Sequence, residues 1–465
     1  MTFTTLWSDV LIYILLFLSF VLIVQIVKQP HLRQRWRKIL YKPLNITAVI
    51  VLSFYVFIGL LDTIHFKETT TEAHLNTNGM VSVLDKLLMP LIVNTEKTYS
   101  APFATHAFVK ENIKLPDDGV IRDYPRLKFG GAHLKDTTLK WQDIGKRFTQ
   151  IILQTLILWA AFSVLMLFYA CRKHKISWEE YSAKVLHGQM AFPWRAFLGT
   201  IGLIIFFVCF TRGFMDYYHI LGTNEVGEDV LYQTLKSIRT GLVIGTLTTL
   251  ITLPFAILFG IMAGYFRGRV DDAIQYVYTT LSSIPAVLLI AAAVLVLQVV
   301  MDNHSDWFET VAHRTDARLL ALCAILGITS WTGLCRLLRG ETLKICEMDF
   351  VLAARSLGSS HGAIILKHLL PNVFHIILIT VVLDFSGLVL AEAVLSYVGV
   401  GVDPASFSWG TMINSARLEM ARQPVVWWCL AAAFVFMFVL VLAANIFSDA
   451  VRDAFDPRAH LEGNK

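Results

Sequence analysis

The chain has 465 residues, of which 55% are hydrophobic and only 16% charged, and its formal net charge is +5. A soluble domain of this size carries about a quarter charged residues, and several apolar runs here are about 20 residues long, enough to cross a bilayer. These features exclude a soluble globular protein and predict an all-α polytopic membrane protein, because the backbone of such runs is satisfied within lipid as helix. The small positive charge needs no nucleic-acid partner, since Lys and Arg gather beside apolar runs, as in cytoplasmic flanks.

Residues 1–66 contain two apolar runs, at about 11–27 and 46–61. The first run lacks the basic start and the small-residue cleavage site of a signal peptide. A basic stretch between the runs, Lys28 to Lys42, is cytoplasmic by the positive-inside rule. We therefore expect an N-terminal two-span extension whose N-terminus lies outside.

Residues 67–148 are polar and rich in Gly, Pro and Asp, which predicts a small extracytoplasmic insertion of mixed structure. His106 and His133 lack a carboxylate or Cys at ligand spacing, so no metal site is expected. The six Cys are scattered, which predicts neither a disulfide framework nor a redox pair. Residues 149–195 hold a third span and a basic cytoplasmic linker, and a fourth span at about 197–214 returns the chain to the outside.

Residues 219–242 read HILGTNEVGEDVLYQTLKSIRTGL. Glycines in this segment allow tight turns, and Asp229 is expected to cap the helix that follows. The run resembles a segment, H-x-L-G-T-D-x-L-G-R-D-V-L, of permeases from ABC importers of dipeptides, oligopeptides and nickel. Asn224 and Glu228 depart from that pattern, so no role of the usual Arg is transferred to Glu228.

Spans five, six and seven are expected at about 242–265, 274–299 and 319–334, with Pro285 kinking the sixth. The stretches AGYFRGRVDD and SIPAVLL in the first two resemble the same permeases. Basic residues after the seventh span make that side cytoplasmic: Arg336, Arg339 and Lys344.

The stretch 349–372, DFVLAARSLGSSHGAIILKHLLPN, is too polar to cross a bilayer, yet apolar runs flank it. Its spacing predicts two short helices, the first with one apolar face: Phe350, Ala353, Ala354 and Leu357. Asp349 is expected to N-cap the first helix, and Gly358 is expected to end it in a left-handed turn. Ser359 or Ser360 caps the second helix, and Pro371 is expected to end it.

This stretch is similar to the cytoplasmic "EAA" loop of ABC-importer permeases. Ala353, Ala354, Gly358, Leu370 and Pro371 match that pattern in spacing, whereas Leu352 replaces the usual Glu and His368 the usual Ile. The resemblance implies a coupling loop, within 339–371, that contacts an ATPase. The residues expected to matter there are Asp349, Ala353, Ala354, Arg355, Ser356, Gly358, Ser360, His361 and Pro371.

An eighth span, at about 376–395, carries Asp384 and Glu392, about 12 Å apart along the helix. Carboxylates inside a membrane face a cavity or a partner, so both are candidates for the translocation path or for a contact with a neighbouring helix. A structural role is favoured for Glu392, and both roles stay open for Asp384. LSYVGVGVDPASFSWGTMINSAR after this span, and FSDAVRDAFDPR after a ninth at about 427–447, again resemble the family.

The resemblance covers about residues 196–460. It implies that residues 196–465 are a permease core with six spans, from the second-permease ("C"-type) subunit of an importer in the bacterial inner membrane. It implies a heterodimer with another permease, two ATPase subunits and an extracytoplasmic solute-binding protein. The sequence contains no GxxxxGK[ST] phosphate loop, so no enzyme activity and no cofactor are expected in this chain, with ATP bound by partner subunits. The C-terminus is expected in the cytoplasm, and the substrate stays open between peptides, nickel and peptide-like antibiotics.

Two other classes of function remain as alternatives. The chain is a membrane-bound sensor or enzyme if residues 67–148 are its working domain, although that region carries no catalytic constellation. A secondary transporter working alone is the other alternative, but the presence of only two buried acids and the lack of a visible inverted repeat argue against it. Co-purification with an ATPase distinguishes the importer from both.

Overall fold

The computed structural model describes residues 2–67, 80–114, 120–175, 177–308 and 310–455. Within these residues nine helical segments are long and apolar enough to cross a bilayer, as the sequence predicts. The prediction of an all-α polytopic membrane protein is therefore confirmed. The segments are Trp7–Gln25, Pro43–Thr63, Thr137–Lys173, Trp194–Phe214, Val230–Phe266, Ala286–Asn303, Val311–Ile345, His361–Tyr397 and Trp428–Phe455.

The prediction of a single kinked sixth span is wrong. Helix α10 (Gly268–Ser283) ends before Ile284, which is extended, and α11 (Ala286–Asn303) starts after Pro285. Pro285 has no N–H to donate to the preceding turn, and the residue before a proline is driven out of the helical region. Both effects act at adjacent residues, so the helix breaks instead of bending.

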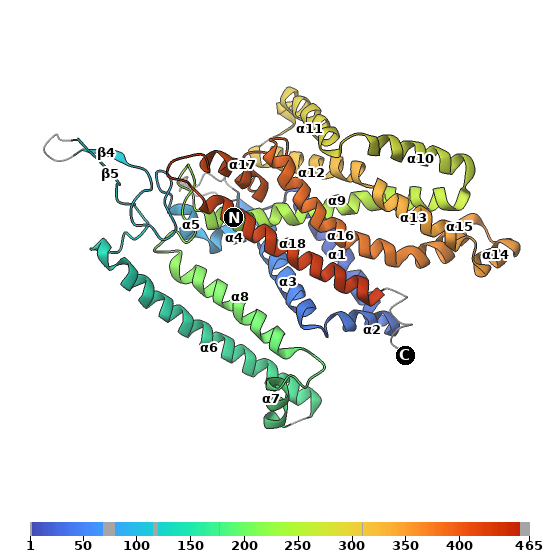
Figure 1. Cartoon of the computed structure of the whole chain (residues 1–465), viewed down its shortest axis with the longest axis horizontal. Coiled ribbons are helices and arrows are strands. Elements are labelled where there is room, and N and C mark those ends of the chain that lie inside the picture. The colour runs from blue at the N-terminus through green and yellow to red at the C-terminus, as the bar shows by residue number, and fades with distance from the viewer. Residues whose placement is uncertain (1, 68–79, 115–119, 176, 309, 456–465) are drawn as a thin grey trace. The chain divides into compact units, whose positions relative to one another are not determined.

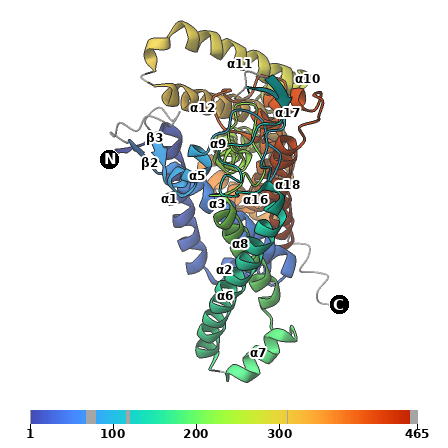
Figure 2. The ribbon, with the colours of Figure 1, turned by 90° about the vertical axis from the view of Figure 1, so that its left-hand side faces the viewer.

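One compact unit of the fold comprises residues 1–5, 37–239 and 407–443. In it α6 and α8 lie side by side and are joined by α7, and α3 packs on α8 (Figures 1 and 2). Its elements are β1 (Thr2–Thr4), α3 (Pro43–Thr63), β2 (His65–Lys67), β3 (Met80–Ser82), α4 (Val83–Leu87), α5 (Met89–Val93), β4 (Glu111–Lys114), β5 (Val120–Asp123), η1 (Thr137–Leu139), α6 (Lys140–His174), α7 (Trp178–Leu186), α8 (Trp194–Phe214) and α17 (Trp409–Glu419).

The strands form two small antiparallel sheets. Sheet β1-β2-β3 pairs Thr2 with Lys67 and His65 with Ser82, and β4 pairs with β5 in a separate hairpin. Short helices α4 and α5 follow β3 directly. The described part of the insertion thus has the mixed structure that its composition predicts.

A second compact unit comprises residues 6–36, 240–406 and 444–465. Within it α11 packs against α12, and α1 packs on α12, where the Ser8 amide donates to Asp316 Oδ2 at 3.1 Å (Figure 2). Its elements are α1 (Trp7–Lys28), α10, α11, η2 (Ser305–Trp307), α12 (Val311–Ser330), α13 (Thr332–Ile345), α14 (Asp349–Ser356), α15 (His361–Ile364), the π-helical turn η3 (Ile365–Leu369) and α16 (Leu370–Tyr397). Helices α2 (Pro30–Ile39), α9 (Val230–Phe266) and α18 (Trp428–Phe455) have residues in both units.

The two spans of the N-terminal extension belong to different units. Helix α1 packs with the core helix α12, whereas α3 packs with α8. The predicted boundaries of the extension and of the insertion therefore do not coincide with compact units. Buried polar contacts such as that of Ser8 with Asp316 explain why: the extra spans complete the packing of core helices.

Helix α9 packs closely on α13 through two glycines. A Cβ on Gly260 would lie 2.8 Å from Leu338 Cβ and 2.9 Å from the Cys335 carbonyl oxygen, and one on Gly264 would lie 2.6 Å from Thr342 Cβ. Small residues let two backbones approach in this way within a membrane. The C-terminal half of α9 is therefore fixed against the helix that leads into the predicted coupling loop.

Candidate functional site

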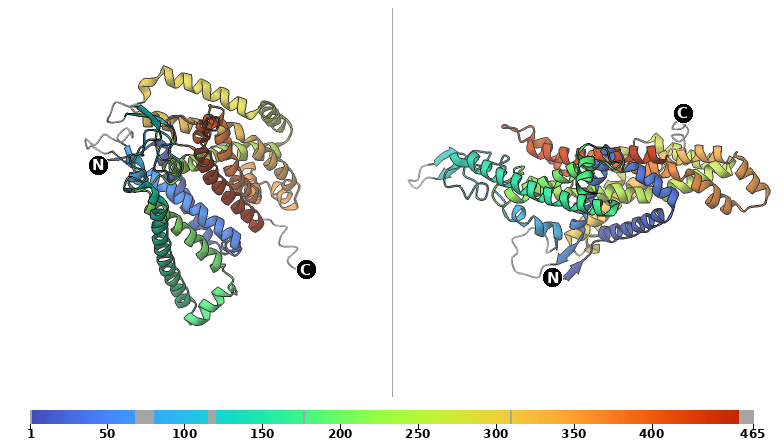
Figure 3. Two further views of the ribbon diagram at one scale, coloured as in Figure 1. Left: turned by 60° about the vertical axis from the view of Figure 1, so that its left-hand side comes forward. Right: turned by 90° about the horizontal axis from the view of Figure 1, so that it is seen from below.

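The predicted coupling loop is a helical hairpin formed by α14 and α15, between α13 and α16 (Figures 1 and 3). The expectation that Asp349 caps α14 is wrong: Met348 is the extended N-cap residue, and Asp349 is the first helical residue. Its carboxylate still lies in the first turn, where negative charge complements the helix dipole. The loop thus keeps the favourable charge without the side-chain cap.

Gly358 ends α14 as predicted. Its φ is +75°, its amide donates to the Arg355 carbonyl at 3.1 Å, and the Ser359 amide donates to the Ala354 carbonyl at 3.1 Å. These two bonds form a Schellman motif, which favours glycine because it has no Cβ. No atom lies within 4 Å of an added Cβ at Gly358, so a substitution there is opposed only by the backbone conformation.

Helix α15 begins at the second of the two candidate serines. The Ser360 hydroxyl accepts a hydrogen bond from the Ala363 amide at 3.3 Å, and Ser360 is extended. The expectation that Pro371 ends this helix is wrong, because α15 runs through η3 into α16. The wider π-helical turn, in which the Leu370 amide donates to the Ile365 carbonyl, accommodates the missing N–H of Pro371. The hairpin is therefore continuous with the eighth span.

The buried face of α14 differs from the predicted apolar face. Val351 and Ala354 are buried, in one cluster with Ile364, Leu369 and Val373. Residues three apart in a helix share a face, so Val351 and Ala354 together hold α14 against α15 and η3. Three apolar side chains, Phe350, Leu352 and Leu357, instead point outward, and Leu357 is 85% exposed. Leu352 stands at the position where the family pattern has Glu.

Tyr265, at the end of α9, is a residue of this site that sequence reasoning missed. Its hydroxyl lies 2.8 Å from His361 Nδ1, and the Arg355 guanidinium lies 5.5 Å from its ring centroid. Both partners were expected at an ATPase contact, and they are also held against α9. The signal was the AGYFRGRVDD stretch, whose resemblance to the family pattern included this tyrosine.

Ion pairs hold the helix ends that lie beside this hairpin. Arg339 of α13 binds both carboxylate oxygens of Asp271 in α10, at 2.5 and 2.7 Å. The hydrogen bonds from Arg339 hold the pKa of Asp271 below its usual value against the opposing effect of burial. Arg267 Nη2 lies 3.0 Å from Glu347 Oε1 at the start of the loop. The bidentate pair of Arg339 with Asp271 fixes the orientation of the two side chains as well as their position.

The two carboxylates of α16 lie in different surroundings. Glu392 is 2% exposed and accepts a hydrogen bond from Ser396 Oγ at 2.6 Å. Asp384, two turns earlier, is half-buried. The structure thus places Glu392 within the packing of this unit, while Asp384 keeps an accessible side.

A buried charge cluster lies in the segment that follows the fourth span. His219 Nδ1 lies 2.9 Å from Asp229 Oδ2, and its Nε2 lies 3.6 Å from Glu96 Oε1 in the insertion. Asp229 Oδ1 accepts from the amides of Leu231 and Tyr232, which confirms it as the cap of α9. The segment is therefore tied both to the span and to the insertion.

Hydrogen bonding decides the charges in this cluster. Burial opposes the protonation of His219, but its hydrogen bond to Asp229 and the nearby Glu96 carboxylate outweigh burial and raise its pKa to about 9. For Glu96 burial acts against ionisation, yet the nearby His219 and the hydrogen bonds from three backbone amides lower its pKa to about 2. Those amides, Lys128, Phe129 and Gly130, donate at 2.8 to 2.9 Å. His219 is thus a buried cation between two carboxylates at neutral pH.

Close backbone contacts and a second ion cluster complete the attachment of the insertion. Gly227 has φ +80°, and a Cβ there would lie 1.9 Å from the Glu96 carbonyl oxygen. On α9, Lys236 Nζ lies 2.6 Å from Asp62 Oδ1 and 2.7 Å from Asp85 Oδ1. Because a buried charge is stable only with partners, these contacts bind α3 and the insertion to α9.

The histidines for which no metal site was expected have ordinary partners. His133 Nε2 lies 2.8 Å from Asp143 Oδ2, and His106 Nδ1 lies 3.1 Å from Thr105 Oγ1. In the part of the chain that the structure describes, no group of three His, Cys, Asp or Glu residues is placed to hold a metal ion.

Comparison with known proteins gives three findings. Residues 256–461 match the family model described as "binding-protein-dependent transport system inner membrane component". The chain is 31% identical over 241 residues to the dipeptide transport system permease protein DppC of Lactococcus lactis, covering 52% of this chain and 64% of that protein. It is 33% identical over 239 residues to the oligopeptide transport system permease protein OppC of Mycobacterium tuberculosis, covering 51% of this chain and 76% of that protein.

A solved structure of the MetNI methionine ABC transporter in inward-facing conformations is 17% identical, covers 48% of this chain and 94% of that chain, and has a TM-score of 0.34. That score is too low to bear on the fold. The nine apolar helical segments of the described residues define a multi-pass membrane protein. Because of these sequence matches, the chain belongs to the family of binding-protein-dependent transport system inner membrane components, which are the permease subunits of ABC importers.

Proposed function

We propose that this chain forms half of a translocation path for peptides, in a heterodimer with a second permease subunit. Two ATPase subunits on the cytoplasmic side and an extracytoplasmic solute-binding protein complete the importer. Relatives named as dipeptide and oligopeptide permeases favour peptides over the other substrates considered. The N-terminus lies outside and the C-terminus inside, in agreement with the basic stretches between spans.

The observation that carries the coupling role is the rigid connection from the hairpin to the spans. Gly358 fixes the turn between α14 and α15, and the helix runs from α15 through η3 into α16. A force on the exposed face of α14 is transmitted to the eighth span, because a continuous helix moves as one body. Tyr265 and the α9–α13 packing carry the same displacement to the fifth span.

The outward apolar side chains of α14 are the surface that fits a groove on an ATPase. An amphipathic helix laid into a groove is a common mode of recognition. Phe350, Leu352 and Leu357 are exposed on this hairpin, where water would otherwise cover them. Closure of the ATPase dimer then pulls the hairpin and rocks the spans between outward-facing and inward-facing states.

The test is to purify the chain from its native membrane with and without the ATPase subunits and to measure ATP hydrolysis by each preparation. The complex should hydrolyse ATP, and the chain purified alone should not, because its sequence has no phosphate loop. ATPase activity that follows the pure chain through every step would contradict the proposal. So would the absence of any ATPase from the complex.

A further inference from the structure

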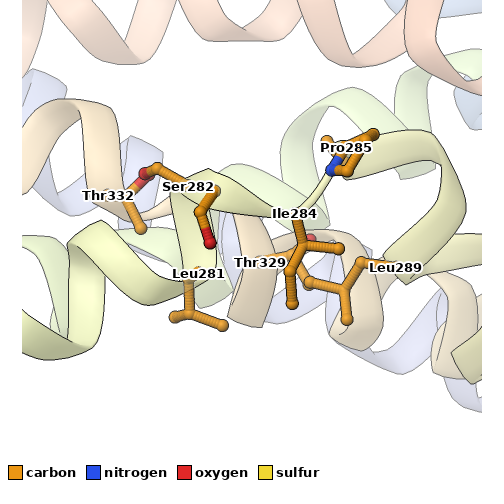
Figure 4. A pocket seen from close by; sticks show the side chains of 9 residues that line it. Leu281, Ser282, Ile284, Pro285, Leu289, Thr329 and Thr332 are labelled. Atoms are coloured by element: carbon orange, nitrogen blue, oxygen red, sulfur yellow. The ribbon is translucent and has the colours of Figure 1, made fainter.

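The break between α10 and α11 opens a pocket that none of the roles above uses. Its volume is about 450 Å³, within the range of sites for small ligands. Ser282 and Ile284 line it from the break, and Thr329 and Thr332 line it from the junction of α12 and α13 (Figure 4). That junction is itself irregular, since Trp331 separates the two helices. Two interrupted helices therefore face each other across the pocket.

The break leaves main-chain groups free. Within the described residues, no hydrogen bond reaches the carbonyl oxygens of Ser282, Ser283 and Ile284. All residues from 282 to 288 are exposed on this chain. Irregular backbone at membrane depth is stable only against protein or in a water-filled cavity, because lipid offers no hydrogen bonds. This surface therefore does not face lipid.

The position of the break places it toward the inner end of the path. Helix α11 is 18 residues long and so rises about 27 Å, nearly one bilayer core, from the break to its outer end at Asn303. Arg336, whose Nη2 donates to Ser282 Oγ at 3.0 Å, lies one turn further toward the basic cytoplasmic flank. A solute leaving the path on the cytoplasmic side passes this level.

We propose that this pocket is a substrate-contact site of the translocation path and binds the main chain of a short peptide. The inference rests on the proposed peptide permease and specifies a site within it. Peptide N–H groups match the free carbonyl oxygens, and a peptide carbonyl group matches the hydroxyl of Thr332, which accepts from Ser282 Oγ at 3.5 Å and keeps its own proton to donate. Recognition of main-chain groups leaves the side chains of the solute free, which suits a transporter of mixed peptides. Discontinuous helices form solute sites in other transporters for the same reason.

The experiment measures the protection of introduced cysteines in the complete transporter in inside-out vesicles. Ser282→Cys and Thr332→Cys are labelled with a water-soluble thiosulfonate reagent, with and without trialanine. Thr280→Cys is the matched control, because Thr280 is exposed on the same helix and its Oγ1 bonds its own helix at the Tyr276 carbonyl. Labelling of the native cysteines is measured on the unsubstituted chain and subtracted.

Trialanine should slow labelling at positions 282 and 332 about fivefold at four times its Kd, since about one site in five is then empty. Trialanine should leave the labelling rate at position 280 unchanged. Maltose, which has no peptide group, should protect none of the three introduced cysteines. Equal labelling with and without trialanine, in vesicles that release trialanine preloaded in their lumen when ATP is added outside, overturns the pocket and leaves the proposed function standing. If the unsubstituted transporter takes up no trialanine or longer alanine peptide, the proposed function falls and this inference falls with it. A crosslink from position 282 to the second permease that trialanine does not affect also overturns the site.

Discussion

His219 shows how a residue of the family pattern gains a role from its surroundings. It is buried between Asp229, which caps α9, and Glu96 of the insertion. A lone histidine in a sequence carries no such information, because Glu96 lies more than a hundred residues earlier. The contact between these residues makes the insertion part of the permease, which counts against a sensor or enzyme domain working by itself.

The first prediction concerns the pH dependence of this contact. The pKa of His219 is raised from 6.5 to about 9, so its stabilisation is complete below about pH 6.5 and is lost as pH rises through 9. The pKa of Glu96 is lowered from 4.5 to about 2, so its stabilisation is present above pH 4.5 and lost as pH falls toward 2. Proteolysis of the insertion should therefore be slowest between about pH 4.5 and 6.5 and faster at pH 9.5.

The matched variants for this prediction are His219→Gln and His133→Gln. The first should destabilise the outer segment by roughly 3–5 kcal/mol, the usual cost of breaking a buried ion pair, and abolish the change between pH 6.5 and 9.5. The second changes a partly exposed histidine and should keep that change. A pH profile of proteolysis that His219→Gln leaves intact would show that another group controls the contact.

Asp384 and Glu392 should respond differently to loss of charge. Asp384 is half-buried on α16, and we expect Asp384→Asn to lower the uptake of lysine-containing peptides several-fold more than that of neutral ones. Glu392→Gln keeps an acceptor for Ser396 and should affect all peptides alike. The measurement is competitive uptake of charged and neutral peptides. Normal transport by Asp384→Leu would rule out both a cation-contacting and a packing role.

At the scale of elements, the sequence predicted the features that depend on neighbouring residues alone, namely apolar spans, a glycine turn and helix caps. Long apolar runs predicted nine spans, although the sixth begins only after the break at Pro285. The turn at Gly358 and the caps at Ser360 and Asp229 follow from the conformational preferences of those residues. Pro371 was misread because a π-helical turn before it, which depends on packing, removes the need to end the helix. The partner of His361, Tyr265, could not be predicted, since nothing in the sequence sets the distance between α9 and the hairpin.

Tyr265 gives the prediction that belongs to this scale. Tyr265→Phe removes the hydrogen bond to His361 and keeps the ring under Arg355. A hydrogen bond contributes about 0.5–1.5 kcal/mol, so we expect peptide uptake per ATP hydrolysed to fall about two- to tenfold while ATP hydrolysis persists. Tyr276→Phe, at a tyrosine that is 75% exposed on α10, is the control and should change nothing. If the two variants show the same peptide uptake per ATP hydrolysed, Tyr265 has no role in coupling.

At the scale of the whole molecule, the topology can be tested directly. Lys110 belongs to the insertion and Leu357 to the hairpin, and both are exposed. Cysteines at these two positions, on a background without other accessible cysteines, should be labelled from opposite sides: position 110 from outside and position 357 from the cytoplasm. Labelling of position 110 from the cytoplasmic side alone would invert the arrangement and place the hairpin away from any ATPase.

The coupling role of the hairpin is tested most directly by the ratio of peptide uptake to ATP hydrolysis in the reconstituted importer when Gly358 is replaced. Gly358→Val meets no neighbouring atom but cannot easily adopt φ +75°, whereas Gly358→Asn tolerates the left-handed region. We predict that Val lowers the ratio about tenfold or more, the equivalent of about 1.4 kcal/mol, with assembly and ATP hydrolysis retained, and that Asn lowers it much less. An unchanged ratio for Gly358→Val would contradict the assignment of this hairpin as the element that couples ATP hydrolysis to transport.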